Sequence, residues 1–233
     1  MIKDVFGKAL LDFQNGNYTE DLITSTNISD EDSLPLPYLF RPYNKMPKLE
    51  QKALQLCKEK VLDVGCGAGN HALWLMKKGL NVKAIDVSQG AIEVSKKRGV
   101  TNAEEKALLD ETDSFDTILL LMNGTGIFQE MMHVATYLNH LKSILNPGGQ
   151  ILIDSSDIKY MFEDEDGGTW IDLNNGYYGE LDYYLSYKGE DEVPLKWLYL
   201  DFDTLKTACQ TLGLKCEKVM DGEHFDYLAR LSL

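Results

Sequence analysis

The chain has 233 residues, of which 44% are hydrophobic, and this suffices for one sizeable α/β domain with an extension. Its 37 acidic residues outnumber 23 basic ones and give a net charge of −14. We therefore expect no nucleic-acid partner, because a polyanion is bound by neutralising it with Lys and Arg. No apolar stretch approaches the roughly 20 residues of a membrane span, so a membrane partner is not expected either.

The cysteines also limit the possible functions. Their positions, 57, 66, 209 and 216, show neither metal-site nor Cys-x-x-Cys spacing, so we predict reduced thiols and no bound metal. The first residues, MIKDVFGKALLDF, lack the apolar core of a signal peptide. We expect a cytoplasmic protein, either a monomer or a homodimer.

Residues 1 to 47 are predicted to form an N-terminal helical cap. An amphipathic helix is expected over 4 to 14, followed by an irregular polar loop over 15 to 33. The next segment, residues 34 to 50, combines four prolines with three aromatic residues and one arginine. It is either an ordinary proline-rich connector or a lid over a cofactor, and in the second case Phe40, Arg41 and Tyr43 are its candidate contacts.

A glycine-rich turn follows the first core helix (48 to 58) and a strand (60 to 64). The sequence VLDVGCGAGN, residues 61 to 70, places Asp63 before Gly65, Gly67 and Gly69, and a helix is predicted over 69 to 78. Glycine accepts a positive φ and lets a ligand approach the main chain. Three glycines also suit a generic βα turn. A dinucleotide fingerprint would place its third glycine at position 70, which is Asn70 here.

The next strands have acids and apolar runs at the expected intervals. The second strand (80 to 86) ends on Asp86, whose carboxylate suits the two hydroxyls of a ribose, or simply the positive end of the helix that begins after Ser88. A third strand is expected at 102 to 107. FDTILLLMNG (115 to 124) and LNPGGQILID (145 to 154) contain the near-continuous apolar runs of strands buried on both faces.

Together these segments resemble the class I S-adenosylmethionine-dependent methyltransferases. The resemblance rests on D-x-G-x-G-x-G from Asp63, Asp86 at the second strand, the Phe-Asp pair at 115, and Pro-Gly-Gly at 147. It implies an α/β fold, a Rossmann-like seven-stranded, mostly parallel sheet with one antiparallel strand. It also implies S-adenosyl-L-methionine as cofactor, S-adenosyl-L-homocysteine as product, and methyl transfer by SN2 substitution to a small-molecule acceptor of unknown identity.

The resemblance assigns the cofactor contacts to the turn and to the ends of the following strands. The implied set is Asp63, Gly65, Cys66, Gly67, Gly69, Asn70, His71, Asp86, Val87, Ala107, Leu108 and Asn123, with Phe40, Arg41 and Tyr43 from the lid. The third strand lacks the acid that in this family often bonds adenine. Main-chain groups of Ala107 and Leu108 are therefore expected to hold the base. Cys66 is expected to be a small filler.

Few residues qualify for the methyl-transfer step. Asn123, just past the fourth strand, is the first candidate, since ligands of open α/β sheets bind at the carboxyl ends of the strands. His71 is the second, either as an acid/base or as a helix-start residue that hydrogen-bonds locally. Asp154 either points into the same site or caps a turn.

The remainder, residues 48 to 233, is predicted to be the methyltransferase domain, with an insertion at about 155 to 200. Within it, 177 to 189 and 193 to 202 are expected to pair as a hairpin, and 214 to 220 and 225 to 233 to form the closing hairpin after a last helix. The insertion supplies aromatic candidates for acceptor contact: Tyr160, Phe162, Trp170, Tyr177 and Tyr178. Two other functions are open: a non-catalytic S-adenosylmethionine-binding module and an NAD-dependent oxidoreductase.

Overall fold

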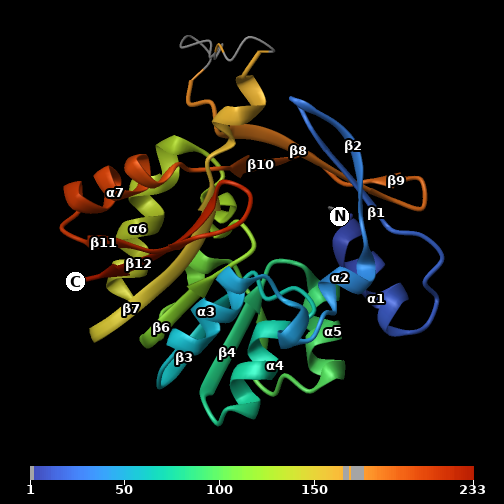
Figure 1. The fold of residues 1–233 in the computed structure, drawn as a ribbon. Coiled ribbons are helices and arrows are strands. Elements are labelled where there is room, and N and C mark those ends of the chain that lie inside the picture. The colour runs from blue at the N-terminus through green and yellow to red at the C-terminus, as the bar shows by residue number, and fades with distance from the viewer. Residues whose placement is uncertain (1–2, 165–167, 169–175) are drawn as a thin grey trace.

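The described residues form two β-sheets. A computed structural model describes residues 3–164, 168 and 176–233, so Trp170 lies outside the described residues (Figure 1). The central sheet has the strand order β11-β12-β7-β6-β3-β4-β5, and the smaller sheet has the order β10-β8-β1-β2, with β9 paired to β8. In the described part of the chain, no helix has the length and apolar character needed to cross a bilayer.

The central sheet confirms the predicted fold class. Five of its strands are parallel, β12 runs antiparallel to β7, and β11 runs antiparallel to β12, so β12 is the one reversed strand. The strands are β3 (Lys60–Val64), β4 (Asn81–Asp86), β5 (Ala103–Glu105), β6 (Phe115–Leu120), β7 (Leu145–Ser156), β11 (Lys215–Asp221) and β12 (Asp226–Ser232).

Helices cover both faces of this sheet (Figure 1). Successive residues of a strand point to opposite faces, so Ile118 and Leu120 pack in one core while Leu119 packs in the other. The helices on the Leu119 side are α3 (Lys48–Leu56), α4 (Asn70–Lys77) and α5 (Gln89–Arg98), and those on the other side are α6 (Val134–Ser143) and α7 (Phe202–Thr211). This layering leaves the carboxyl ends of the parallel strands at one edge, where the glycine turn lies.

Short 3-10 helices occupy several connections. They are η1 (Tyr43–Lys45), η2 (Leu108–Asp110), η3 (Gly124–Phe128), η4 (Met131–His133) and η5 (Ile158–Phe162). The helical segment before β7 changes type, because η4 is followed directly by the α-helix α6.

The N-terminal part contains strands as well as helices. It consists of α1 (Val5–Gln14), β1 (Leu22–Thr26), β2 (Ser29–Leu34) and α2 (Leu36–Leu39). The irregular loop predicted over 15 to 33 is therefore wrong, because β1 pairs with β8, a strand distant in the sequence. β2 is a polar edge strand rich in acids, a composition that discourages further pairing.

The insertion supplies the rest of the smaller sheet. Its strands are β8 (Glu180–Tyr187), β9 (Glu190–Asp191) and β10 (Leu195–Leu198), and β8 pairs with β10 as the predicted hairpin. Leu185 and Tyr187 from β8 share a core with Val5 and Leu10 of α1. The N-terminal segment and the insertion thus form one cap, and the domain boundary expected at residue 47 stays a prediction.

Candidate active site

The glycine turn joins β3 to α4 at the carboxyl edge of the sheet. Gly65, Gly67 and Gly69 all have positive φ, at 68°, 51° and 80°. The amides of Gly65 and Cys66 donate to the carbonyl of Ile85, at 2.9 and 3.1 Å, which holds the turn against β4. A Cβ on Gly69 would lie 2.9 Å from Ser95 Oγ. The turn therefore requires glycine for its backbone conformation and for its packing on α5.

Asp86 lies beside this turn, as the sequence predicts. Its Oδ2 accepts from the amide of Gly67 and its Oδ1 from the amide of Ser88, both at 2.9 Å. Burial raises the pKa of Asp86 to about 6, and the charges of Asp4 and Asp63 add to this rise. Each carboxylate oxygen has a second lone pair, so both can accept a further bond from a ligand.

An apolar surface adjoins Asp86. The Val87 side chain is 73% exposed, and the amide of Lys106 donates to the Asp86 carbonyl at 2.9 Å, which brings the neighbouring Ala107 to the same edge. Leu108 is instead buried in the core behind it. Ala107 and Val87 thus lie beside Asp86 at the carboxyl edge of the sheet, while the Leu108 side chain points into the core.

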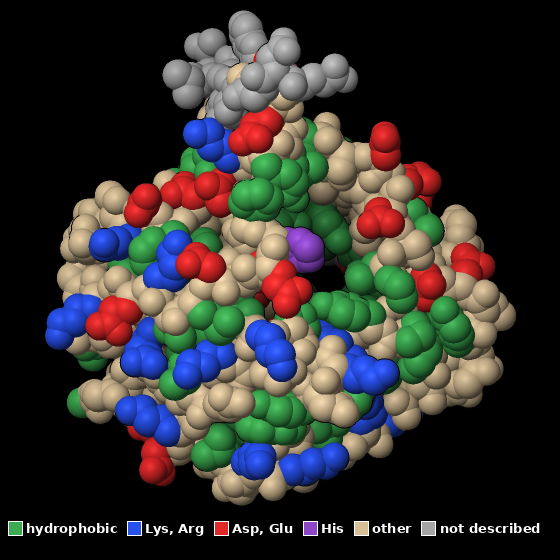
Figure 2. Space-filling model, in the orientation of Figure 1, with side chains coloured by type: hydrophobic (Ala, Val, Ile, Leu, Met, Phe, Trp, Pro, Cys, Tyr) green, Lys and Arg blue, Asp and Glu red, His purple; other side chains and the backbone are tan. Residues whose placement is uncertain are grey.

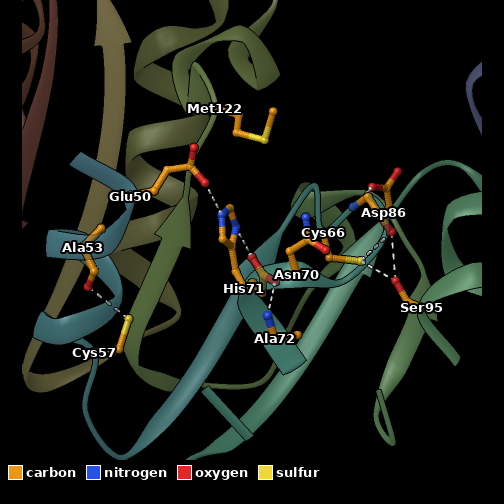
Figure 3. Close-up of polar contacts among 12 residues, drawn as sticks. Glu50, Ala53, Cys57, Cys66, Asn70, His71, Ala72, Asp86, Ser95 and Met122 are labelled. Carbon is orange, nitrogen blue, oxygen red and sulfur yellow. Dashed lines mark hydrogen bonds and ion pairs between the residues drawn. The ribbon is translucent and has the colours of Figure 1, made fainter. Parts of the chain in front are cut away.

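Four charged side chains form a buried chain between the glycine turn and the N-terminal cap, and Figure 3 shows the contact between two of them, Glu50 and His71. His71 Nδ1 lies 3.8 Å from Asp63 Oδ1, and His71 Nε2 lies 2.8 Å from Glu50 Oε2. The other oxygen of Glu50 bonds Arg41 Nη2. None of the four residues is more than 8% exposed. Charges alternate along this chain, so each buried group has an opposite neighbour.

The surroundings of His71 favour its protonated form. Burial lowers the pKa of His71, but the hydrogen bonds and charges of Asp63 and Glu50 outweigh it and raise that pKa to about 9. An imidazolium whose two nitrogens face carboxylates is poorly suited to act as a base at neutral pH. The geometry favours the second of the two alternatives for His71, a helix-start residue with local bonds. Glu50, which sequence reasoning missed, is its main partner.

Two of the three guanidinium nitrogens of Arg41 have hydrogen-bond partners. Its Nη1 donates to the carbonyl of Tyr38 at 2.7 Å, and its guanidinium lies 3.8 Å from the Tyr38 ring centroid. Its Nε is buried and has no hydrogen-bond partner among the described residues. A buried, orphaned donor is costly unless a ligand satisfies it. This cation, the open glycine turn and Asp86 together fit a ligand with an anionic group and a ribose.

Asn70 connects the glycine turn to the lid segment, which we define as residues 36–45. Its Nδ2 donates to the Leu39 carbonyl at 2.7 Å, and its Oδ1 accepts from Arg98 at 2.6 Å. Arg98 also lies 4.8 Å from the Phe40 ring. The residue that breaks the dinucleotide pattern thus holds the lid segment against the turn. These contacts favour the lid over the simple connector.

Two predicted lid contacts are not brought to the turn. The Phe40 ring packs on Phe13 in the cap core, 4.4 Å between centroids. Tyr43 stacks on Trp74 at 4.4 Å, and its hydroxyl accepts from Gln55. Both rings are used in packing, so the structure gives no support to direct cofactor contacts from them.

Cys66 lies in the turn with its thiol turned toward α5. The Sγ atom is 3.7 Å from Ser95 Oγ, and burial raises the pKa of the Cys66 thiol well above its usual range (Figure 3). A neutral buried thiol is a poor nucleophile. This agrees with its predicted place as a small filler.

Asn123 lies in a strained turn after β6. Met122 and Asn123 both have positive φ, 67° and 62°. Asp154 stabilises the turn, because its carboxylate accepts from the amides of Met122 at 3.1 Å and Gly124 at 2.8 Å. Burial raises the pKa of Asp154 to about 6. Asp154 therefore caps the turn that carries Asn123.

The amide of Asn123 has partners at both ends. Its Oδ1 accepts from Ser155 Oγ at 3.1 Å, and its Nδ2 donates to the Leu198 carbonyl at 3.4 Å. It thereby fastens β10 of the cap to the edge of the central sheet. Next to Asn123, Met122 is 40% exposed, and in Figure 3 its side chain lies above Glu50 and His71.

The aromatic residues of the insertion divide into packed and exposed ones. Tyr177 and Tyr178 pack on each other, and their hydroxyls donate to Asp201 and Asp157 at 2.6 and 2.8 Å. Phe162 lies against Tyr178. Tyr160 is 44% exposed, the most exposed described member of the predicted set, and its ring stacks on Phe225 at 4.8 Å between centroids. The face drawn in Figure 2 is hollowed near its centre, below the β8–β10 region, and the rim of the hollow carries hydrophobic side chains together with a histidine and an acidic side chain.

Comparisons with known proteins identify the family of the chain. A family model described as a methyltransferase domain matches residues 61–149. The chain is also similar to a crystal structure of a SAM-dependent methyltransferase from Bacteroides fragilis in complex with S-adenosyl-L-homocysteine. The identity is 43%, the match covers 99% of this chain and 95% of that one, and the TM-score is 0.93.

Curated relatives match over a shorter region. A ubiquinone biosynthesis O-methyltransferase from Histophilus somni is 28% identical over 103 residues, 44% of this chain and 42% of that protein. The methyltransferase GfsG from Streptomyces halstedii is 31% identical over 119 residues, 45% of this chain and 40% of that protein. The match thus spans about two fifths of the length of these relatives. The full-length match at 43% identity nevertheless settles the family: the chain belongs to the S-adenosylmethionine-dependent methyltransferases.

Proposed function

We propose that this chain transfers a methyl group from S-adenosyl-L-methionine to a small-molecule acceptor. The observation that carries the proposal is the glycine turn with Asp86 at the carboxyl edge of the sheet, in a chain 43% identical to a methyltransferase bound to S-adenosyl-L-homocysteine. When bound, S-adenosylmethionine supplies an electrophilic methyl group on its sulfonium sulfur. Net charge of −14 and an enclosing cap both favour a small acceptor over a nucleic acid.

The residues of the chain have separable tasks in this proposal. The turn Gly65–Gly69 and Asp86 bind the sugar-bearing part, with Val87 and Ala107 against the base. Arg41 offers its unpaired Nε to an anionic group. Positioning is then the main catalytic contribution, because aligning a nucleophile with the methyl group supplies a large effective concentration.

The turn at Asn123 positions the acceptor rather than exchanging protons. Its amide is bonded at both ends, and neighbouring Asp154 is engaged by two backbone amides. We infer that Met122 and Tyr160, both partly exposed, contribute apolar contact to the acceptor. The cytoplasm is the proposed compartment, and a monomer or homodimer the proposed assembly.

Calorimetry tests the cofactor, with S-adenosylhomocysteine, S-adenosylmethionine and NAD titrated separately. We expect micromolar binding of the first two and none of NAD, because Asn70 holds the lid segment where the dinucleotide pattern needs glycine. Binding of NAD with no binding of S-adenosylhomocysteine would overturn the assignment.

Incubation with methyl-labelled S-adenosylmethionine and a metabolite extract tests turnover. Label should appear in a small-molecule fraction and should disappear when S-adenosylhomocysteine is added in excess. Binding without any transfer would instead favour the non-catalytic module.

A further inference from the structure

The buried charge chain joins three separate elements around the glycine turn, in addition to the Asn70–Leu39 hydrogen bond and the Tyr43–Trp74 stack. Arg41 belongs to the lid segment, Glu50 to α3, and His71 to the first turn of α4. Glu50 is the middle member and 3% exposed. Burial raises the pKa of Glu50, but bonds from His71 and Arg41 outweigh it and keep that pKa below its ordinary value. Glu50 is therefore an anion with a cation on each side.

Stability alone is a weak reason for such an arrangement. Buried ion pairs often contribute no more to stability than apolar residues of similar volume, because desolvation offsets the attraction. Their geometry, in contrast, is strict: each carboxylate oxygen of Glu50 has a different cationic partner. A group with these properties is suited to fix the relative position of two elements.

We propose that Glu50 is a positioning residue that fastens the lid segment to the start of α4, one oxygen holding Arg41 and the other holding His71. We call Arg41, Glu50 and His71 together the lock. Its role in cofactor binding rests on the proposed function, since α4 begins directly after the glycine turn. With Glu50 in place, the Arg41 Nε donor is held buried and ready for the ligand. Without it, Arg41 loses the carboxylate that orients its guanidinium.

The lock has a defined charge environment. His71 faces Glu50 from α3 and Asp63 from β3, and Glu50 in turn faces Arg41 and Tyr38 of the lid segment and Asp154 of β7. The pKa of His71 is higher in the folded protein, at about 9, than its ordinary value of 6.5. Its stabilising contribution is thus complete below about pH 6.5 and declines as the pH rises towards 9.

Glu50→Gln is the sharpest test, because glutamine keeps the shape but offers one oxygen in place of two. We expect amide hydrogen exchange in residues 36–45 of the ligand-free protein to rise by about tenfold or more, since a charge-assisted bond is lost. The pKa of His71, followed by NMR, should fall from about 9 towards its ordinary value. Affinity for S-adenosylhomocysteine should fall by about tenfold.

Asp116→Asn is a matched control. Like Glu50, Asp116 has one partner on each carboxylate oxygen, here the backbone amide of Lys60 and the side-chain amide of Asn146, but it lies at the opposite edge of the sheet. This variant should leave lid exchange and S-adenosylhomocysteine affinity unchanged, even where it lowers the unfolding temperature.

Two results would overturn the lock. One is a Glu50→Gln protein with wild-type lid exchange, and the other is an unshifted His71 pKa. Both measurements are made without ligand, so they stand even if wild type fails to bind S-adenosylhomocysteine, which would instead refute the proposed function. If Glu50→Gln does not fold, Arg41→Gln and His71→Gln replace it. The lock then requires that each raises lid exchange and that their effects are not additive.

Discussion

Buried carboxylates organise the site at the scale of single residues. Asp86 anchors the turn through Gly67, and Asp154 holds the backbone on both sides of Asn123. Burial raises the pKa of both acids to about 6, which shows that their charges are only partly compensated by hydrogen bonds. The ionised form of such a carboxyl is stabilised further when a ligand donates hydrogen bonds to it.

Asp86→Ala should weaken S-adenosylhomocysteine binding by about 1–3 kcal/mol, because ribose hydroxyls lose their acceptor and the Gly67 amide loses its anchor. Calorimetry measures the change directly. Asp86→Asn retains one acceptor oxygen and should fall between wild type and Asp86→Ala. An affinity that does not change in Asp86→Ala would mean that Asp86 makes no ribose contact.

Some site residues could be predicted from the sequence and others could not. Asp63, the three glycines and Asp86 stand in a local pattern with fixed spacing, so one stretch of sequence suffices to find them. Glu50 has no such pattern, because one acid on an amphipathic helix is usually a solvent-facing residue. Its burial is caused by Arg41 and His71, which reach it from other elements.

At the scale of elements, the same distinction separates the central sheet from the cap. Strands buried in a parallel sheet carry long apolar runs, and these runs allowed the strands to be predicted from the sequence. β1, in contrast, is a short, mostly polar strand whose partner β8 lies more than 150 residues further on, so no local signal marks it. The hairpin of β8 and β10 was predictable from its alternation, but its pairing with the N-terminal segment was not.

The packing of α1 on α5 gives a prediction for one glycine. An ideal Cβ on Gly90 would lie 2.6 Å from the backbone of Gly7, so the two helices meet through their glycines. Gly90→Ala should push α1 away and destabilise the protein by about 1–3 kcal/mol, although alanine is the better helix former. Urea unfolding measures this.

Gln89→Ala is the comparison, since Gln89 is exposed on the same helix. It should be neutral or slightly stabilising. A Gly90→Ala protein as stable as wild type would show that α1 tolerates displacement.

At the scale of the whole molecule, the cap and the central sheet share packed surfaces. Ala68 of the glycine turn and Ala91 of α5 belong to the same core as Val5 and Leu185 of the cap. Polar contacts add to this: Asp4, which caps α1, also accepts from Ser88 and Gly90 at the start of α5. The cap is thus built onto the cofactor turn and is not an independent unit.

This shared core predicts that cap and central sheet unfold together. Trp197 on β10 and Trp74 on α4 can report on the two parts separately, each as the remaining tryptophan after Trp170 and the other have been replaced by Phe. In urea unfolding of each single-tryptophan protein, the midpoint measured by fluorescence should coincide with the midpoint measured by circular dichroism on the same protein. This comparison within one protein removes the effect of the Trp→Phe replacements on stability. Saturating S-adenosylhomocysteine at about 100 times its Kd should shift both by the same free energy, about 2.7 kcal/mol. A Trp197 transition at lower urea than the circular dichroism transition, or one insensitive to ligand, would contradict this and make the cap a separately folding unit.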